Sequence, residues 1–296
     1  MDLFATRGEK VFFVLNYIFL GLLAFLALFP FYLVVVRAIA PTVDYVVRDV
    51  VLYPSKITWQ YFEMLFNDPA TKIWVAYQNT IFTTVVGTLI NMVMTIISAF
   101  PLAERKLPFR SQITFFILIP MFIGGTLLPC YILYSSLGLL NTLWVLIIPG
   151  AIGTYNLLLY RNFLMQLPEE LLEASIIDGC SQLQTIWYII LPLSKAALAT
   201  IGLFYAVGHW NAWFYHMVFL KSRSKYPLQL ILREILITND MSSMTKVVDI
   251  GSYTNDRYKL LVRYATIIIA TLPILTVYPF AQRFFVKGVM IGAVKG

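Results

Sequence analysis

The stretch Glu173-Ala174-Ser175-Ile176-Ile177-Asp178-Gly179, with Leu191-Pro192 further along, is a short polar insert between long apolar runs. The preceding Leu167-Pro168-Glu169-Glu170 is typical of a helix start, because proline suits the first helical position and acidic residues suit the positive end of the helix dipole. Gly179 fits the position after a helix end, where a positive φ is needed. The insert therefore predicts a helix, a turn and a second helix over residues 180–190.

The first of these helices carries its apolar residues on one side. Leu171, Leu172, Ser175 and Ile176 follow the spacing of a single helical stripe. Such a stripe either enters a groove on a partner protein or belongs to an ordinary interfacial helix between membrane spans. The pattern alone leaves both interpretations open.

Composition places the whole chain among membrane proteins. Of its 296 residues, 59% are hydrophobic and 12% are charged, whereas soluble domains have about 45–50% and about 25%. The net charge of +7 does not indicate nucleic-acid binding, because no block of five or more basic residues occurs. Cys130 lies in an apolar run and Cys180 beside the polar insert, so no disulfide is expected. The first apolar run is too long for a cleavable signal peptide.

The apolar runs predict an all-α membrane protein with six transmembrane helices. About 20 residues at about 1.5 Å each cross a hydrocarbon core about 30 Å thick. The run over 111–160 is long enough for two helices, and Gly138, Asn141 and Thr142 predict a tight outer hairpin between them. The expected spans are Val11–Val36, Ile73–Ala103, the two helices within Ser111–Tyr160, Trp187–Leu220 and Tyr264–Gln282.

Charge does not decide the orientation of these spans. With both termini inside, ten of the 22 basic residues lie on inner segments and twelve on outer segments, and eight of the twelve are in or near the loop 221–263. The rule that inner loops carry the positive charge is therefore not met. The outer segments hold eight acidic residues against those twelve bases, and this positive field would favour an acidic sugar.

Several segments resemble the carbohydrate-type permeases of binding-protein-dependent ABC importers, and the likeness covers essentially the whole chain. The polar insert is similar to their EAA loop, although Ser175 and Cys180 replace the usual alanines. The relatives that it resembles are the G-type permease of maltose importers and the second permease of complex oligosaccharide importers. The other segments that carry the resemblance are Gln78-Asn79-Thr80, Ala99 to Arg105, Trp210-Asn211 and the tail Phe285 to Gly296.

This resemblance implies a bacterial inner-membrane permease with both termini in the cytosol. It divides the chain into a cytosolic N-terminus (1–10), a six-helix domain (11–285) with the EAA-like loop at 168–192 and an outer loop at 221–257, and a cytosolic tail (286–296). The EAA-like loop would lie in the cytosol between spans four and five and dock on an ATPase. The coupling residues that it implies are Glu173, Ala174, Asp178, Gly179, Leu171 and Ile176.

The resemblance also implies partners. They are a second homologous permease, two cytosolic ATPases, an extracytoplasmic sugar-binding protein, an oligosaccharide and membrane lipid, with no nucleic acid. The sequence has no G-x-x-x-x-G-K-[ST] and no G-x-S-x-G motif. The chain is therefore expected to be no enzyme and to hold no cofactor or metal, with ATP and Mg²⁺ bound by the partner ATPases.

Two alternatives compete with an ATP-driven importer. A secondary transporter driven by an ion gradient needs ionisable residues at mid-span. Only Lys195, His209 and His216 qualify, without any Asp or Glu, and Lys195 is expected to snorkel to the cytosolic surface. A membrane scaffold or receptor is the other alternative, and it would not need a docking loop of this pattern.

Aromatic and polar residues gather in the outer half of the fifth span. They either line a sugar path, where ring faces and hydrogen-bonding groups bind sugars, or form an interfacial aromatic belt. These candidate path residues are His209, Trp210, Asn211, Trp213, Tyr215 and His216. In the outer loop, the spacing of Leu228, Leu230, Ile231, Ile235 and Leu236 predicts a short amphipathic helix that contacts the binding protein or packs on the bundle.

Overall fold

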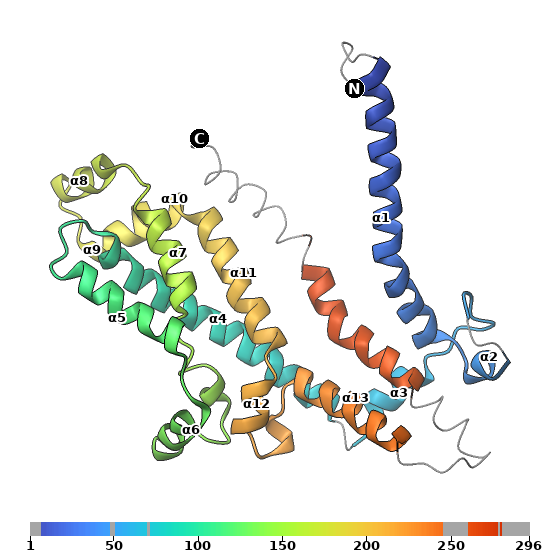
Figure 1. Cartoon of the computed structure of the whole chain (residues 1–296). Coiled ribbons are helices and arrows are strands. Elements are labelled where there is room, and N and C mark those ends of the chain that lie inside the picture. Colours follow the sequence, from blue (N-terminus) through green and yellow to red (C-terminus); the bar gives the residue numbers. More distant parts are fainter. Residues whose placement is uncertain (1–6, 48–50, 70–71, 245–259, 278, 280–296) are drawn as a thin grey trace. The chain divides into compact units, whose positions relative to one another are not determined.

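The structure is a computed structural model that describes residues 7–47, 51–69, 72–244, 260–277 and 279 (Figure 1). Every regular element in these ranges is helical, which confirms the all-α expectation for the described part of the chain. The chain divides into two compact units, one within residues 1–71 and 232–272 and the other within residues 72–231 and 273–296. The N-terminal residues 1–6, much of the outer loop and the tail 286–296 lie outside the described residues.

The first unit is built on a long apolar helix at the N-terminal end. The guanidinium of Arg37, in its last turn, donates a hydrogen bond to the Tyr264 hydroxyl and lies 5.1 Å from the centre of the Tyr264 ring. Tyr61 donates to the carbonyl of Ala40 at 3.1 Å. The helices of this unit are α1 (Arg7–Ile39), α2 (Thr42–Val47), α3 (Gln60–Asn67), the part of α13 (Leu228–Met244) from Leu232 onward, and the helix Leu260–Val277 as far as Leu272.

The second unit is a bundle in which α4, α7 and α11 pack against one another. Its core contains Leu102, Leu157, Tyr160, Ile201 and Tyr205. Its elements are α4 (Ile73–Ala103), α5 (Arg110–Ile123), α6 (Leu127–Ser136), η1 (Leu143–Leu146), α7 (Thr154–Leu164), α8 (Glu169–Ile177), α9 (Gln182–Thr185), the π-turn η2 (Ile186–Ile190), α10 (Leu191–Leu193), α11 (Lys195–Asn211), α12 (Phe214–Phe219), η3 (Arg223–Lys225) and the start of α13 (Leu228–Met244).

Three described helices are long and apolar enough to cross a membrane, and the number rises to five if two bent helix pairs each count as one span. The three are Gly8–Ile39, Ile73–Ala103 and Leu260–Val277. The prediction for the second span, Ile73–Ala103, matches α4 at both ends. The first span was predicted over Val11–Val36, within α1, and the end of the sixth lies outside the described residues.

The first of the two helices predicted between Ser111 and Tyr160 is broken into α5 and α6. The segment bends by 114° between α5 and α6. Pro120 lies in the last turn of α5, and Gly124 follows it with φ of +63°. Since proline removes a backbone donor and glycine tolerates positive φ, the chain leaves the helix here.

The expected outer hairpin is present at the predicted residues. Gly138 has φ of +68° and Asn141 has φ of +57°. The side-chain oxygen of Asn141 accepts hydrogen bonds from the backbone N–H groups of Lys221 (3.1 Å) and Ser222 (2.9 Å). The hairpin is thus tied to the segment that follows α12, a long-range contact that the turn signals alone do not reveal.

The fifth span, predicted over Trp187–Leu220, is not one straight helix. The chain bends by 88° between residues 182–193 and α11. Pro192 has no N–H to continue the helix, and the Ser194 hydroxyl donates to the carbonyl of Ile190 at 2.6 Å, a type of bond that bends helices. Lys195 is therefore the first residue of α11, exposed at the bend.

The predicted helix in the outer loop is present as α13. Leu228 and Ile231 are fully buried at its start. The backbone N–H of Leu228 donates to the hydroxyl of Thr80 on α4 at 2.7 Å. The beginning of α13 therefore packs on the bundle, one of the two roles that the sequence left open.

The packing of α4 against α11 depends on Gly87, which has no side chain at the point of contact. At Gly87, a Cβ would lie 2.6 Å from His209 Nε2. That nitrogen donates to the side-chain oxygen of Asn91 at 2.7 Å, and the Asn91 amide donates to the carbonyl of Gly150 at 2.5 Å. The imidazole thus occupies the space that glycine leaves and connects two helices to the segment before α7.

We predict that Gly87→Ala destabilises the bundle, because the new methyl group meets the His209 ring. Overpacking of this kind costs about 1–3 kcal/mol. Thermal unfolding of the purified chain in detergent measures the loss as a lower midpoint. Gly208→Ala in α11 is the matched control, since nothing lies within 4 Å of its Cβ position. Equal midpoints for the two variants would contradict the close approach.

Candidate functional site

The polar insert forms α8, and the start of this helix differs by one residue from the prediction. Pro168, with ψ of 132°, precedes the helix as its N-cap and does not occupy the first helical position. Glu169 and Glu170 then fill the first turn, where carboxylates favour the positive end of the helix dipole. The residue types were identified correctly, and only the boundary moved.

The end of α8 confirms the role expected of Gly179. This residue has φ of +75°. Its N–H donates to the carbonyl of Ile176 at 3.0 Å, and the N–H of Cys180 donates to the carbonyl of Ser175 at 2.9 Å. These two bonds form a Schellman motif, which ends a helix and satisfies its last carbonyl groups. The chain can therefore reverse sharply after Asp178.

The predicted single apolar stripe of α8 is split between two faces. Leu172 packs against the core of the bundle and Ser175 is buried. Leu171 is partly exposed, whereas Ile176 is 73% and Ile177 is 85% exposed. The positions i, i+1, i+4 and i+5 span a wide arc of a helix, so the bundle covers only one edge of it. The outward edge is an apolar patch without cover in the described structure.

Ser175 joins α8 to the helix that follows. Its hydroxyl donates to the carbonyl of Leu172 at 2.7 Å and accepts from the Thr185 hydroxyl at 3.2 Å. Both side chains are buried. An alanine at position 175 would lack this bond, so the substitution noted in the sequence adds a polar link between α8 and α9.

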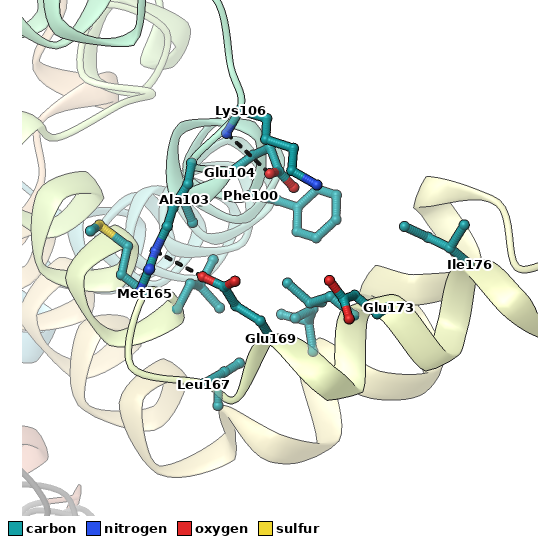
Figure 2. A pocket seen from close by; sticks show the side chains of 13 residues that line it. Phe100, Ala103, Glu104, Lys106, Met165, Leu167, Glu169, Glu173 and Ile176 are labelled. Atoms are coloured by element: carbon teal, nitrogen blue, oxygen red, sulfur yellow. Dashed lines mark hydrogen bonds and ion pairs between the residues drawn. The ribbon is translucent and has the colours of Figure 1, made fainter.

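A pocket of about 220 Å³ lies between α8, the end of α4 and the end of α7 (Figure 2). Its wall is apolar on the bundle side, and charged side chains from the α4–α5 turn and from α8 surround the opening. The lining residues are Phe100, Ala103, Glu104, Arg105, Lys106, Leu164, Met165, Leu167, Glu169, Leu172, Glu173, Ile176 and Ile190.

Two of the carboxylates around this pocket have partners. Arg105 Nε lies 2.9 Å from Glu169 Oε1, in an exposed ion pair that contributes little because solvent screens it. Glu104 accepts a hydrogen bond from the backbone N–H of Lys106 at 3.2 Å. The Glu173 carboxylate has no ion pair or hydrogen bond within the described part of the chain, although it lies at the same pocket (Figure 2). Glu173 is therefore available to an external cation.

The remaining coupling candidates lie on the accessible side of α8. Ala174 and Asp178 are exposed, next to the patch formed by Ile176 and Ile177. The structure thus brings a free carboxylate, an apolar patch and a rigid helix end to one short element. An arrangement of this kind suits a helix that enters a groove on another protein.

The candidate path residues have different surroundings. His209 is held between helices by Gly87 and Asn91, as described above. Trp210 and Asn211 end α11, and Trp213 directly precedes α12, with the centre of its ring 5.6 Å from that of Phe214. The last two candidates lie in α12. Tyr215 is exposed and stacks on Phe219, with the ring centres 5.7 Å apart, whereas His216 is buried.

The sequence analysis missed a line of polar contacts inside the bundle. The hydroxyl groups of Thr95 and Tyr205 lie 2.9 Å apart, and the N–H of Gly153 donates to the Tyr205 hydroxyl at 3.1 Å. Asn91 lies one turn before Thr95 on the same buried face of α4. Polar and small residues at every third or fourth position of an apolar helix were the signal for these contacts.

Comparison with known proteins gives consistent results. Residues 73–291 match the sequence profile of the binding-protein-dependent transport system inner membrane component. The chain is 38% identical over 291 residues to Protein LplC of Bacillus subtilis (strain 168), covering 98% of this chain and 97% of that protein. It is 35% identical over 293 residues to the polygalacturonan/rhamnogalacturonan transport system permease protein YtcP of the same organism, covering 97% and 99%.

A solved structure is also similar. It belongs to a bacterial ABC transporter involved in the import of the acidic polysaccharide alginate. The similarity has a TM-score of 0.83 at 28% sequence identity and covers 96% of this chain and all of the other.

We predict that Gly179→Val loosens the end of α8, because a β-branched residue at positive φ is strained. Gly179→Asn is the matched variant, since asparagine tolerates this conformation. Amide hydrogen exchange should be faster at residues 179 and 180 in the valine variant and close to wild type in the asparagine variant. Wild-type protection in both variants would show that the glycine is not needed for the turn.

Proposed function

This chain belongs to the binding-protein-dependent transport system inner membrane component family, and on that premise we propose how it couples to ATP hydrolysis and what it carries. Members of this family are permeases of ABC importers, so the chain is a multi-pass bacterial membrane permease and not a secondary transporter driven by an ion gradient. In the proposed function, α8 is the coupling helix through which a cytosolic ATPase acts on the bundle.

The observation that supports this role is the unpaired carboxylate of Glu173 beside the exposed Ile176 and Ile177. A groove on the ATPase would cover the apolar patch, and a cationic side chain near the pocket would pair with Glu173. Apolar anchors at the centre of such an interface provide most of the affinity. The charge pair would fix the register of the helix in the groove.

Contacts inside the bundle support transmission from α8 to the spans. Leu172 and Ile190 both pack with the cluster that contains Tyr160 of α7. The Tyr160 hydroxyl lies 2.9 Å from the Ser194 hydroxyl, at the bend before α11. A displacement of α8 therefore acts on α7 and α11 together, because close-packed side chains transmit strain.

The proposed assembly follows from this role. The chain pairs with a second permease of the same kind, two cytosolic ATPases bind the two coupling helices, and an extracytoplasmic binding protein delivers the substrate. The ATPases bind ATP and Mg²⁺. Nucleotide binding shifts the population between inward-open and outward-open states. In this arrangement both termini of the permease lie in the cytosol.

We propose an oligosaccharide that contains uronate units as the substrate. Two of the similar proteins are named for polygalacturonan/rhamnogalacturonan transport and for import of the acidic polysaccharide alginate. The excess of basic over acidic residues on the expected outer segments of this chain agrees with an acidic substrate. Trp210, Asn211, Trp213 and Tyr215 are the path residues proposed for ring stacking and hydrogen bonding, with His209 holding the helices that carry them.

We predict that Glu173→Lys weakens ATPase binding about tenfold or more, equivalent to a loss of about 1.4 kcal/mol or more, because it replaces attraction by repulsion. A tagged chain purified in mild detergent, with its partners quantified by mass spectrometry, measures the effect. Glu170→Lys is the matched control, since Glu170 lies on the same helix but does not line the pocket.

Two outcomes of that experiment would contradict the proposal. Wild-type recovery of the ATPase with Glu173→Lys would exclude this carboxylate from the interface. Recovery of the wild-type chain alone, under conditions that hold a control importer together, would exclude the proposed assembly.

We predict that vesicles containing the assembled transporter take up uronate-bearing oligosaccharides faster than neutral ones of equal length. The difference should shrink as salt is raised, because salt screens interactions beyond a Debye length of about 10 Å at 0.1 M. Radiolabelled uptake at two ionic strengths measures both effects. Equal uptake of the two substrates at low salt would remove the acidic-sugar proposal.

A further inference from the structure

Residues 182–193 form a helical segment that runs almost perpendicular to α11, with an angle of 88° between them. The 17 residues of α11 extend about 25 Å, most of the way across a hydrocarbon core about 30 Å thick. If α11 crosses the membrane, the segment 182–193 lies in the membrane plane. Its position at one end of α11 places it near a membrane surface.

The segment has two distinct faces. Thr185, Ile186 and Ile190 are buried against the bundle. Trp187 and Tyr188 are exposed, at 68% and 69%. They lie in the π-turn η2, between the buried Ile186 and the half-buried Ile189.

The outer face is aromatic and apolar, and the segment has no charge. From Cys180 to Ser194 the sequence contains no Asp, Glu, Lys or Arg. Leu183 adds to the exposed apolar face. Tryptophan and tyrosine are enriched where a membrane meets water, because one part of each side chain is apolar and the other is polar. An exposed lysine, Lys195, follows at the bend, where a cation can approach lipid phosphates.

The residues at the start of the segment, Ser181 and Gln184, are polar and suit a position exposed to water. Ser181 is its N-cap, and a capping box connects it to Gln184: the backbone N–H of Ser181 donates to Gln184 Oε1 at 2.7 Å, and the N–H of Gln184 donates to the Ser181 hydroxyl at 3.4 Å. These bonds satisfy two of the backbone N–H groups at the helix start from within the segment itself. The segment therefore begins in a polar environment and carries its aromatic pair one turn later.

We propose that residues 182–193 are an interfacial anchor whose Trp187 and Tyr188 lie among the lipid headgroups and upper acyl chains. The occupant of this face is lipid, because the segment lies almost perpendicular to α11 at its end, carries no charge and exposes two residue types that favour the boundary. The anchor holds the end of α8 at a fixed height, since only the Gly179 turn separates the two helices. This consequence for α8 rests on its proposed coupling role, whereas the lipid contact does not.

Quenching of tryptophan fluorescence by brominated lipids tests the contact in the assembled transporter in vesicles. We expect lipids brominated near the headgroup to quench the wild type, and Trp187→Phe to reduce that quenching by the share of one of the six tryptophans of the chain. The double variant Trp187→Phe/Tyr188→Trp should restore it, because it moves the indole to the neighbouring exposed position. Trp210→Phe is the control, since it removes one tryptophan and leaves Trp187 in place.

Three results would overturn the proposal. Equal quenching of the wild type and Trp187→Phe by every brominated lipid would show that protein covers the face. Stronger quenching by lipids brominated near the chain end would place the segment in the hydrocarbon core as half of a broken span. Loss of iodide quenching with Trp187→Phe, without loss of lipid quenching, would place the indole in water. None of these measurements depends on ATPase binding, so failure here is distinguishable from failure of the Glu173 experiment.

Discussion

The close approach of α4 and α11 is the constraint on which the second unit depends. In lipid, helices gain little from burying apolar surface against each other, so association depends on small residues and interhelical hydrogen bonds. Gly87 provides the space and Asn91 provides the hydrogen bond for His209. Because Asn91 also binds the carbonyl of Gly150, one side chain sets the distance between α4, α11 and the segment before α7. The positions of the path residues at the end of α11 follow from that contact.

The contacts between α8 and the bundle determine which helices respond when α8 is displaced. A coupling helix is useful only if its displacement reaches the spans before it is absorbed locally. Leu172 and the Ser175–Thr185 pair fix α8 to the bundle on its inner edge, while Ile176 and Ile177 remain free on the outer edge. A partner that binds the outer edge of α8 therefore acts on a helix whose inner edge already packs on the bundle.

Features that local sequence patterns encode were predicted correctly. Features that depend on tertiary contacts were not. Both ends of α4 and the positive φ of Gly179 follow from apolar run length and from a backbone conformation that glycine prefers. The bend at Ser194 combines local causes, Pro192 and the bond from Ser194 to Ile190, with a contact to the Tyr160 hydroxyl that no local pattern reports. The apolar residues of α8 were recognised, but a stripe does not say which of its edges is covered. His209 was placed correctly in the sequence as a polar residue within a span, yet its partner Asn91 lies 118 positions away.

The bend at Ser194 also explains why the polar insert is not a flexible loop. A straight continuation of α11 would carry residues 182–193 away from the membrane surface and leave α8 attached to a free end. The 88° turn instead returns the chain along the end of the bundle, where Ile186 and Ile190 are buried. The helix α8, the Schellman turn at Gly179 and residues 182–193 thus form one continuous segment. It follows α7 at one end and leads into α11 at the other. In the proposed function, a displacement of α8 would therefore act on both α7 and α11.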